Sequence, residues 1–137
     1  MKFRAVLIAA WAIAACGAAA QPSELVGRWR VSAVLEASSI TALDGAEAAK
    51  LVGQELVVSP AAVQFAGMSC KATFAKSQES ARDMAADYGV NPKLLKLPDP
   101  ATSYEAGCID LFVRDAKTVV FTWKGYFFEA SKPAPAR

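Results

Sequence analysis

Acidic residues are the side chains of this 137-residue chain whose type and spacing come closest to a catalytic arrangement. Paired carboxylates can divide the roles of general acid and general base between them. Glu105 and Asp110 lie on either side of Cys108, but a separation of five residues places them on opposite faces of a regular strand. Asp83 and Asp87 are four residues apart and share one face of a predicted helix. We expect both pairs to be solvated surface acids.

Other catalytic and metal-binding chemistries lack the residues that they need. The chain contains no His, which excludes Ser-His-Asp and Cys-His nucleophile systems and His-ligated metal sites. The sequence also has no Gly-x-Ser-x-Gly elbow, Cys-x-x-Cys pair, P-loop or EF-hand loop. We therefore predict that the protein is not an enzyme, and that it uses neither a cofactor nor a metal.

The charge of the chain argues against nucleic acid as a partner. The net charge of +2 comes from Lys2 and Arg4, and beyond them the basic and acidic residues are equal in number. A neutral domain without basic runs has little electrostatic attraction for nucleic acid or for anionic lipid. We predict no nucleic-acid binding.

The N-terminal segment has the pattern of an export signal. The positive charges of Lys2 and Arg4 precede an uncharged apolar run over residues 5–15, which is shorter than the roughly 20 residues that a membrane-spanning helix needs. This pattern predicts a signal peptide at residues 1–20 and export to the periplasm.

Two processing signals lie at the end of this segment. Ile13-Ala14-Ala15-Cys16 resembles the lipobox of bacterial lipoproteins, in which the Cys is acylated and becomes the new N-terminus. Gly17 follows it, rather than the Asp that the lipoprotein family associates with inner-membrane retention, so acylation of Cys16 would anchor the protein in the outer membrane. Ala18-Ala19-Ala20 before Gln21 instead fits ordinary signal-peptide cleavage and a free periplasmic protein.

Both processing routes leave the same two cysteines in the exported chain. Cys70 and Cys108 have a single possible pairing. In an oxidising periplasm we predict a disulfide between them, which the chain-entropy estimate values at about 4 kcal/mol.

The exported chain is expected to form one β-rich domain over residues 21–131, followed by a disordered tail at 132–137. Alternating apolar residues predict strands at 28–35, 104–114 and 117–124, and short strand-like runs predict further strands at 55–59, 62–66, 70–75 and 126–130. Two short helices are predicted at 46–52, with Asp44 and Glu47 forming a capping box, and at 78–88, ended by Gly89. The three prolines of 91–100 predict a loop. The fold class is therefore mainly β (or α+β): a small antiparallel barrel or curled sheet of six to eight strands with two short helices and one disulfide.

The first strand carries a resemblance to a known family. Gly27-Arg28-Trp29 resembles the G-x-W motif of the calycins, the lipocalin-like barrels, whose Trp closes one end of the barrel. Lys124 lies in the last hairpin, where that family places a basic residue against the Trp. The wider pattern over most of residues 25–131 is also similar to small bacterial envelope proteins. The resemblance implies a lipocalin-like barrel with Trp29 and Lys124 at its closed end.

Two functions are consistent with these features. The first is lipocalin-like binding of a small apolar ligand by a periplasm-facing envelope lipoprotein. Its pocket or barrel end would be formed by Trp29, Phe65, Phe121, Trp123 and Lys124. The alternative is a protein-binding inhibitor or immunity-type protein acting on an envelope hydrolase, with exposed loops at 67–71 and 92–103 as its binding surface.

Overall fold

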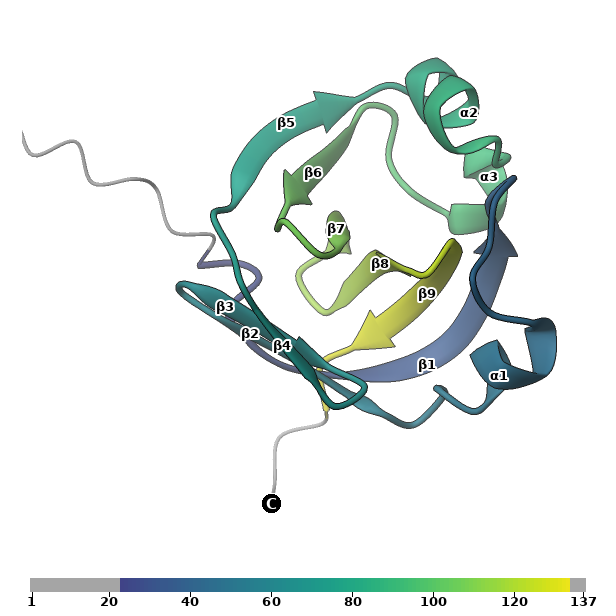
Figure 1. Cartoon of the computed structure of the whole chain (residues 1–137). Helices are drawn as coiled ribbons and strands as arrows, with labels where there is room; N and C mark the ends of the chain where they lie inside the picture. The colour runs from purple at the N-terminus through teal and green to yellow at the C-terminus, as the bar shows by residue number, and fades with distance from the viewer. Residues whose placement is uncertain (1–22, 134–137) are drawn as a thin grey trace, which may run out of the picture.

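The computed structural model describes residues 23–133 of the chain. The predicted signal peptide, the lipobox Ile13–Cys16 with its acylation site Cys16, and residues 134–137 of the predicted tail lie outside these described residues. Within residues 23–133, nine antiparallel strands form a single sheet that curls into a half-barrel (Figure 1). The mainly β, curled antiparallel fold is confirmed, whereas the prediction of six to eight strands is too low.

The sheet consists of two meanders joined side by side. The first contains β1 (Gly27–Ala37), β2 (Glu55–Ser59), β3 (Ala62–Phe65) and β4 (Met68–Lys71). The second contains β5 (Ala75–Glu79), β6 (Ala101–Glu105), β7 (Asp110–Asp115), β8 (Thr118–Trp123) and β9 (Tyr126–Ser131). The strand order β4-β3-β2-β1-β9-β8-β7-β6-β5 places β4 and β5 at the two ends of the sheet.

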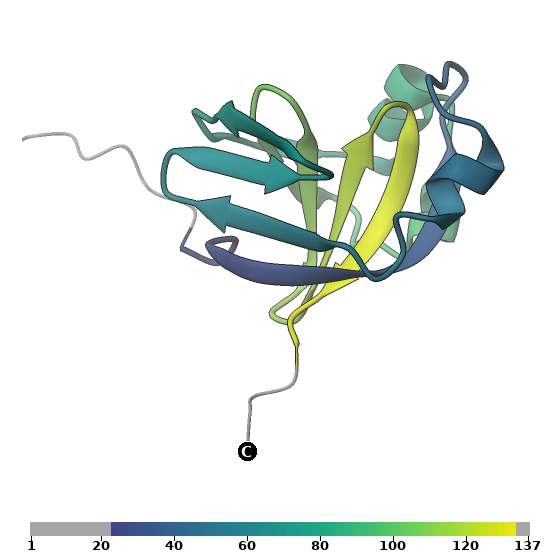
Figure 2. The same ribbon diagram turned by 60° about the horizontal axis from the view of Figure 1, so that its bottom comes forward.

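The long strand β1 joins the two meanders and bends between them. Residues 27–30 pair with β2, and the strand pairs with β9 from Arg30 to its end. The register with β9 shifts after Val31 and again after Val34. Such shifts are typical of β-bulges, which bend a strand and increase its twist. As Figure 2 shows, β1 therefore extends from the β2–β4 side of the molecule to β9.

Within the described chain there are three short helices, one more than predicted: α1 (Gly45–Ala49), α2 (Ala81–Tyr88) and α3 (Pro92–Leu95). The capping box of α1 is confirmed, since the Glu47 N–H donates to Asp44 Oδ1 at 2.7 Å. Helix α2 begins three residues later than predicted because Ser80 caps it. Gly89 ends α2 in the left-handed conformation at φ 67°, as the sequence predicts.

Two elements between residues 70 and 100 differ from the prediction. The single strand predicted at 70–75 is divided, with β4 ending at Lys71 and β5 beginning at Ala75. Strand β5 is mostly exposed and polar, so no alternation of apolar residues marks it. Helix α3 lies in the predicted loop, where the Asn91 side chain accepts from the Lys93 N–H and Pro92 occupies the first turn.

Each face of the sheet packs in its own core. The inner face holds the larger core, whose biggest side chains are Trp29, Leu56, Leu111, Phe121 and Phe128. On the outer face, Phe112, Val120 and Phe127 of β7–β9 form a second core with Met84 of α2 and Leu95 of α3. Figure 1 shows these two helices on the outside of the curled sheet. Around α1, Leu43 and Leu51 pack against the inner core, whereas Val52 is exposed and Ile40 is 83% exposed.

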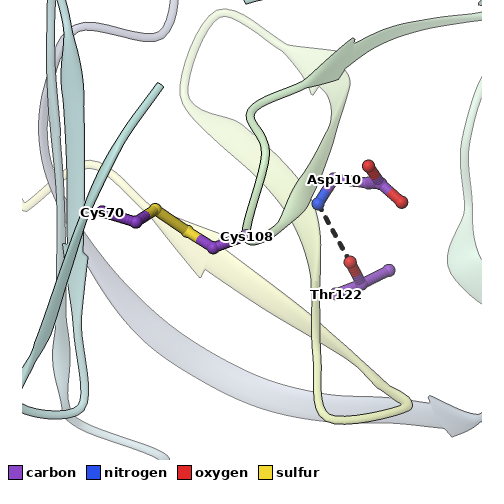
Figure 3. Close-up of a disulfide and its surroundings, with 4 residues drawn as sticks. All are labelled: Cys70, Cys108, Asp110 and Thr122. Carbon is purple, nitrogen blue, oxygen red and sulfur yellow. Dashed lines mark hydrogen bonds between the residues drawn. A yellow bond between two sulfur atoms is a disulfide. The ribbon is translucent and has the colours of Figure 1, made fainter. Parts of the chain in front are cut away.

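The predicted disulfide is confirmed. Figure 3 shows it between Cys70 on β4 and Cys108 in the turn from β6 to β7. Since β4 is one end of the strand order and β6 lies next to the other end, the bond ties the two ends of the curled sheet together. In the same view, the Asp110 N–H donates to Thr122 Oγ1 at 3.0 Å, which joins the start of β7 to β8.

A partly buried ion pair holds α3 on the outer face. Arg114 of β7 donates to the Glu129 carboxylate of β9, and its Nη2 also donates to the Leu95 carbonyl at 2.7 Å. Ser32 Oγ donates to the other Glu129 oxygen at 2.8 Å. The pKa of Glu129 is lower than its usual value, first because Arg114 donates a hydrogen bond to the carboxylate and then because Ser32 does. Burial of the carboxylate opposes this shift only in part.

This ion pair predicts a specific acid sensitivity. A carboxyl group whose pKa is lower in the folded state stabilises the fold above its unfolded pKa of about 4.3, and this contribution is lost as the pH falls through the folded pKa. Urea unfolding between pH 6 and pH 3 should therefore show a smaller acid-induced loss of stability for Glu129→Gln than for the wild type. The control Glu36→Gln removes the same charge from β1 and should leave the wild-type profile. Identical profiles for Glu129→Gln and the wild type would contradict the role of this pair.

Candidate functional site

The aromatic residues predicted to line a pocket lie together in the inner core. The Phe65 ring centre is 5.0 Å from that of Phe121 and 5.2 Å from that of Trp123, with edge-to-face geometry in both pairs. These three side chains and Trp29 are buried. Because the Phe65, Phe121 and Trp123 rings contact one another, they pack as part of the core, and Phe65 also borders a hollow on β2, β3 and β4.

Trp29 is anchored at the start of β1. Its side chain is 1% exposed, and its Nε1–H donates to the Leu25 carbonyl at 2.8 Å. The Lys132 ammonium lies 5.0 Å from the centre of the Trp29 ring, within the range of a cation–π interaction. Lys132 is the first residue of the predicted tail, yet its backbone N–H donates to the Lys117 carbonyl. Trp29 is therefore a buried core residue at the start of β1, with a basic side chain over its ring.

The basic residue over Trp29 is different from the one predicted. The Lys124 ammonium instead lies over the ring of Trp123, the residue before it in the chain, at 5.7 Å from the ring centre. The reason is topological: Lys124 follows β8 in the turn to β9, whereas Ser131 lies at the opposite end of β9 and pairs with β1 close to Trp29. This pairing brings the next residue, Lys132, onto the Trp29 ring.

A hollow of about 330 Å³ opens on the outer face of β5, β6 and β7, beside the C-terminal end of α2. We call it the acidic hollow, because its charged lining consists of three carboxylates, Glu79, Glu105 and Asp110, and one ammonium, Lys76. Its other polar lining residues include Ser77, Tyr88 and Ser103. The Ser77 and Ser103 hydroxyl groups are hydrogen-bonded to each other at 2.7 Å. The Tyr88 hydroxyl donates to Asp110 Oδ2 at 2.8 Å. The first of these hydrogen bonds joins β5 to β6 beneath the hollow, and the second joins α2 to β7 at its side.

The position of Glu105 and Asp110 corrects the prediction from their spacing. They are directly opposite each other in the β6–β7 register, and both line the acidic hollow. The expectation of opposite faces assumed one continuous strand, but residues 106–109 form a turn with Gly107 at φ 84°. Gly107 is the feature of the sequence that could have indicated this turn, because a Gly within a strand pattern often marks a turn or bulge.

Local charges make the acidic hollow an unfavourable place for further negative charge. The pKa of Glu79 is higher than its usual value, mainly because the carboxyl group is partly buried. The negative charges of Asp87, Asp83 and Asp110 raise this pKa further. Burial and the hydrogen bond to Asp110 also raise the pKa of Tyr88, so its hydroxyl remains a donor at neutral pH. Asp83 and Asp87 themselves are exposed on α2, as expected. Three lining carboxylates against the single Lys76 ammonium leave the hollow with an excess of negative charge, which favours a cation.

A second hollow, of about 400 Å³, lies on β2, β3 and β4. It includes residues 67–69 of the first predicted binding loop, and Met68 in its wall is 43% exposed. The other predicted loop, 92–103, is less accessible than expected, because Leu95, Ala101 and Ser103 are buried.

Comparisons with protein families, curated proteins and solved structures found no significant match. Within residues 23–133, no three or more His, Cys, Asp or Glu side chains are grouped as metal ligands. None of the helices in this described part is long and apolar enough to cross a membrane.

Proposed function

We propose that this protein is a non-catalytic, exported envelope protein that binds a cationic protein through the acidic hollow, as an inhibitor or immunity-type partner of an envelope hydrolase. The observation that carries the proposal is the gathering of Glu79, Glu105 and Asp110 around one outer hollow. Asp83 and Asp87 add their charges from α2. Complementary charge of this kind orients a partner and raises the rate of association.

The neutral balance of the chain beyond Arg4 is compatible with this proposal, since the attraction is local. At physiological ionic strength, charges are screened beyond about 8 Å, so the nearby carboxylates matter more to a docked partner than the net charge. The hollow is also at the lower end of the size range of small-molecule pockets, roughly 300–1,000 Å³. That size suits one or two basic side chains of a partner.

The geometry gives less support to lipocalin-like binding of a small apolar ligand. Such a ligand would need space among Trp29, Phe65, Phe121 and Trp123, whose rings form a contiguous buried core. The buried Trp29 supports the calycin resemblance at the barrel end only. Export, and anchoring through acylated Cys16, are proposals supported by the N-terminal sequence pattern.

Charge neutralisation of the acidic hollow tests the function. The probe is a strongly basic lysozyme-type glycan hydrolase, with binding measured by fluorescence titration at low and physiological salt and inhibition measured as the rate of cell-wall lysis. The wild type should bind and inhibit, more strongly at low salt. The triple variant Glu79→Gln, Glu105→Gln, Asp110→Asn should bind about tenfold more weakly, from roughly 0.5 kcal/mol for each exposed charge pair.

The matched control removes three carboxylates elsewhere: Glu36→Gln, Glu47→Gln and Asp115→Asn. Gln at position 47 preserves the capping box of α1, because Gln serves that role as Glu does. This control should retain wild-type affinity. Absence of binding by the wild type, or equal loss in both triple variants, would contradict the proposal.

A further inference from the structure

The acidic hollow adjoins an open edge of the sheet. Strand β5 pairs only with β6, in an unbroken register from Ala75 opposite Glu105 to Glu79 opposite Ala101. In the strand order of the described residues β5 is terminal, so backbone N–H and C=O groups along its other edge face no neighbouring strand. The other terminal strand, β4, is tied by its Cys70 to the β6–β7 turn.

Several of the usual devices that prevent another chain from pairing with a sheet edge are absent from the free edge of β5. Soluble proteins protect such edges with proline, bulges, short strands or charged side chains, lysine above all. Strand β5 has no proline and no register shift. Its one lysine, Lys76, lies with its ammonium 5.7 Å from the centre of the Tyr104 ring, on the β6 side. The edge is therefore open to an additional strand.

From this juxtaposition we infer that the partner adds an extended segment to the free edge of β5 and places Lys or Arg side chains, at alternate positions, over the acidic hollow. The inference rests on the proposed function and specifies its mode of binding. Ser77 and Glu79 alternate along β5 and both line the hollow. On an added strand, side chains opposite them would project to the same face, with Cβ atoms about 5 Å away.

Charge favours a cationic segment over a second copy of this chain. Antiparallel pairing of two β5 strands would bring two acidic hollows, each with Glu79, Glu105 and Asp110, to one interface. Like charges placed together oppose association, whereas a strand with alternate basic residues neutralises them. The recognised partner is thus an extended basic segment.

Backbone methylation of a peptide separates strand addition from attraction between charges. The probe is a blocked heptapeptide, Thr-Lys-Thr-Lys-Thr-Lys-Thr, with two derivatives N-methylated either at every Lys amide or at every Thr amide. In an added strand, alternate amides point to opposite edges, so only one set donates to β5. One methylated peptide should bind at least tenfold more weakly than the parent, and the other should bind as the parent does.

Two further measurements with the purified protein complete the test. Amide hydrogen exchange within residues 75–79 should slow at least tenfold when the parent peptide binds. The triple variant of the acidic hollow should lose about tenfold in affinity for the parent peptide, and the control triple variant should not. Equal binding of both methylated peptides without protection of β5 would overturn strand addition. If the basic hydrolase still bound through the hollow, the proposed function would stand. Self-association that protects β5 without peptide would identify a second copy as the occupant and also overturn the inference.

Discussion

Replacing Cys70 and Cys108 together by alanine should lower the melting temperature by roughly 15 °C or more. The disulfide joins residues separated by 38 positions, and closing a loop of that length in the unfolded chain is worth about 4 kcal/mol on the entropy estimate. For a domain of roughly 100 residues, each kcal/mol corresponds to about 4–8 °C. Scanning calorimetry of the wild type with and without reductant, beside the double variant, measures this shift.

The position of the disulfide predicts where the weakened molecule opens first. Cys70 lies on β4, the terminal strand of the first meander, and the bond holds it to the turn after β6. Without the bond, amide exchange should accelerate most in β3 and β4. The control Ser69→Ala changes the adjacent, exposed position and should leave the melting temperature within about 2 °C. A shift of only a few degrees in the double variant would show that the bond contributes little to stability.

The parts of the fold that the sequence predicts well depend on local patterns. The β7–β8 hairpin consists of two short runs rich in β-branched and aromatic residues on either side of a turn, and the spacing of Asp44 and Glu47 indicates the start of α1. Gly89 ends α2 because a left-handed residue is required there. The Cys70–Cys108 pairing followed from counting cysteines. Each of the three patterns lies within a short segment of the chain, and two cysteines allow only one disulfide pairing.

The parts that the sequence does not predict depend on contacts between distant segments. Strand β5 is defined by pairing with β6, about 25 residues later, and not by a hydrophobic pattern. Without β5 the sequence does not predict the acidic hollow either. Its three carboxylates come from three strands, and only the register between these strands makes them neighbours. Parity alone predicts opposite faces for Glu105 and Asp110, but they are paired directly opposite each other because residues 106–109 form a turn between two strands. The sequence also predicts the wrong lysine over Trp29, Lys124 in place of Lys132, because the position of Lys132 depends on how β9 pairs with β1.

Trp29→Ala should destabilise the protein by about 3–5 kcal/mol, the range for removing a large buried aromatic side chain. The substitution removes a side chain that is 1% exposed in the inner core and leaves the Leu25 carbonyl without its Nε1–H donor. Urea unfolding measures the loss. Were Trp29 part of an exposed binding patch instead, its replacement would leave stability nearly unchanged.

Lys132→Ala should cost less, because only the cation–π contact and the packing of the Lys stem over Trp29 disappear. Since the two side chains share this contact, the double variant should be less destabilised than the sum of the single variants by about 0.5 kcal/mol or more. Lys124→Ala is the matched control: its ammonium lies over Trp123, so its effect should add to that of Trp29→Ala. Additivity for Lys132 would mean that the cation over the ring contributes nothing to stability. Coupling through Lys124 would contradict the pairing of β9 with β1 that places Lys132 beside Trp29.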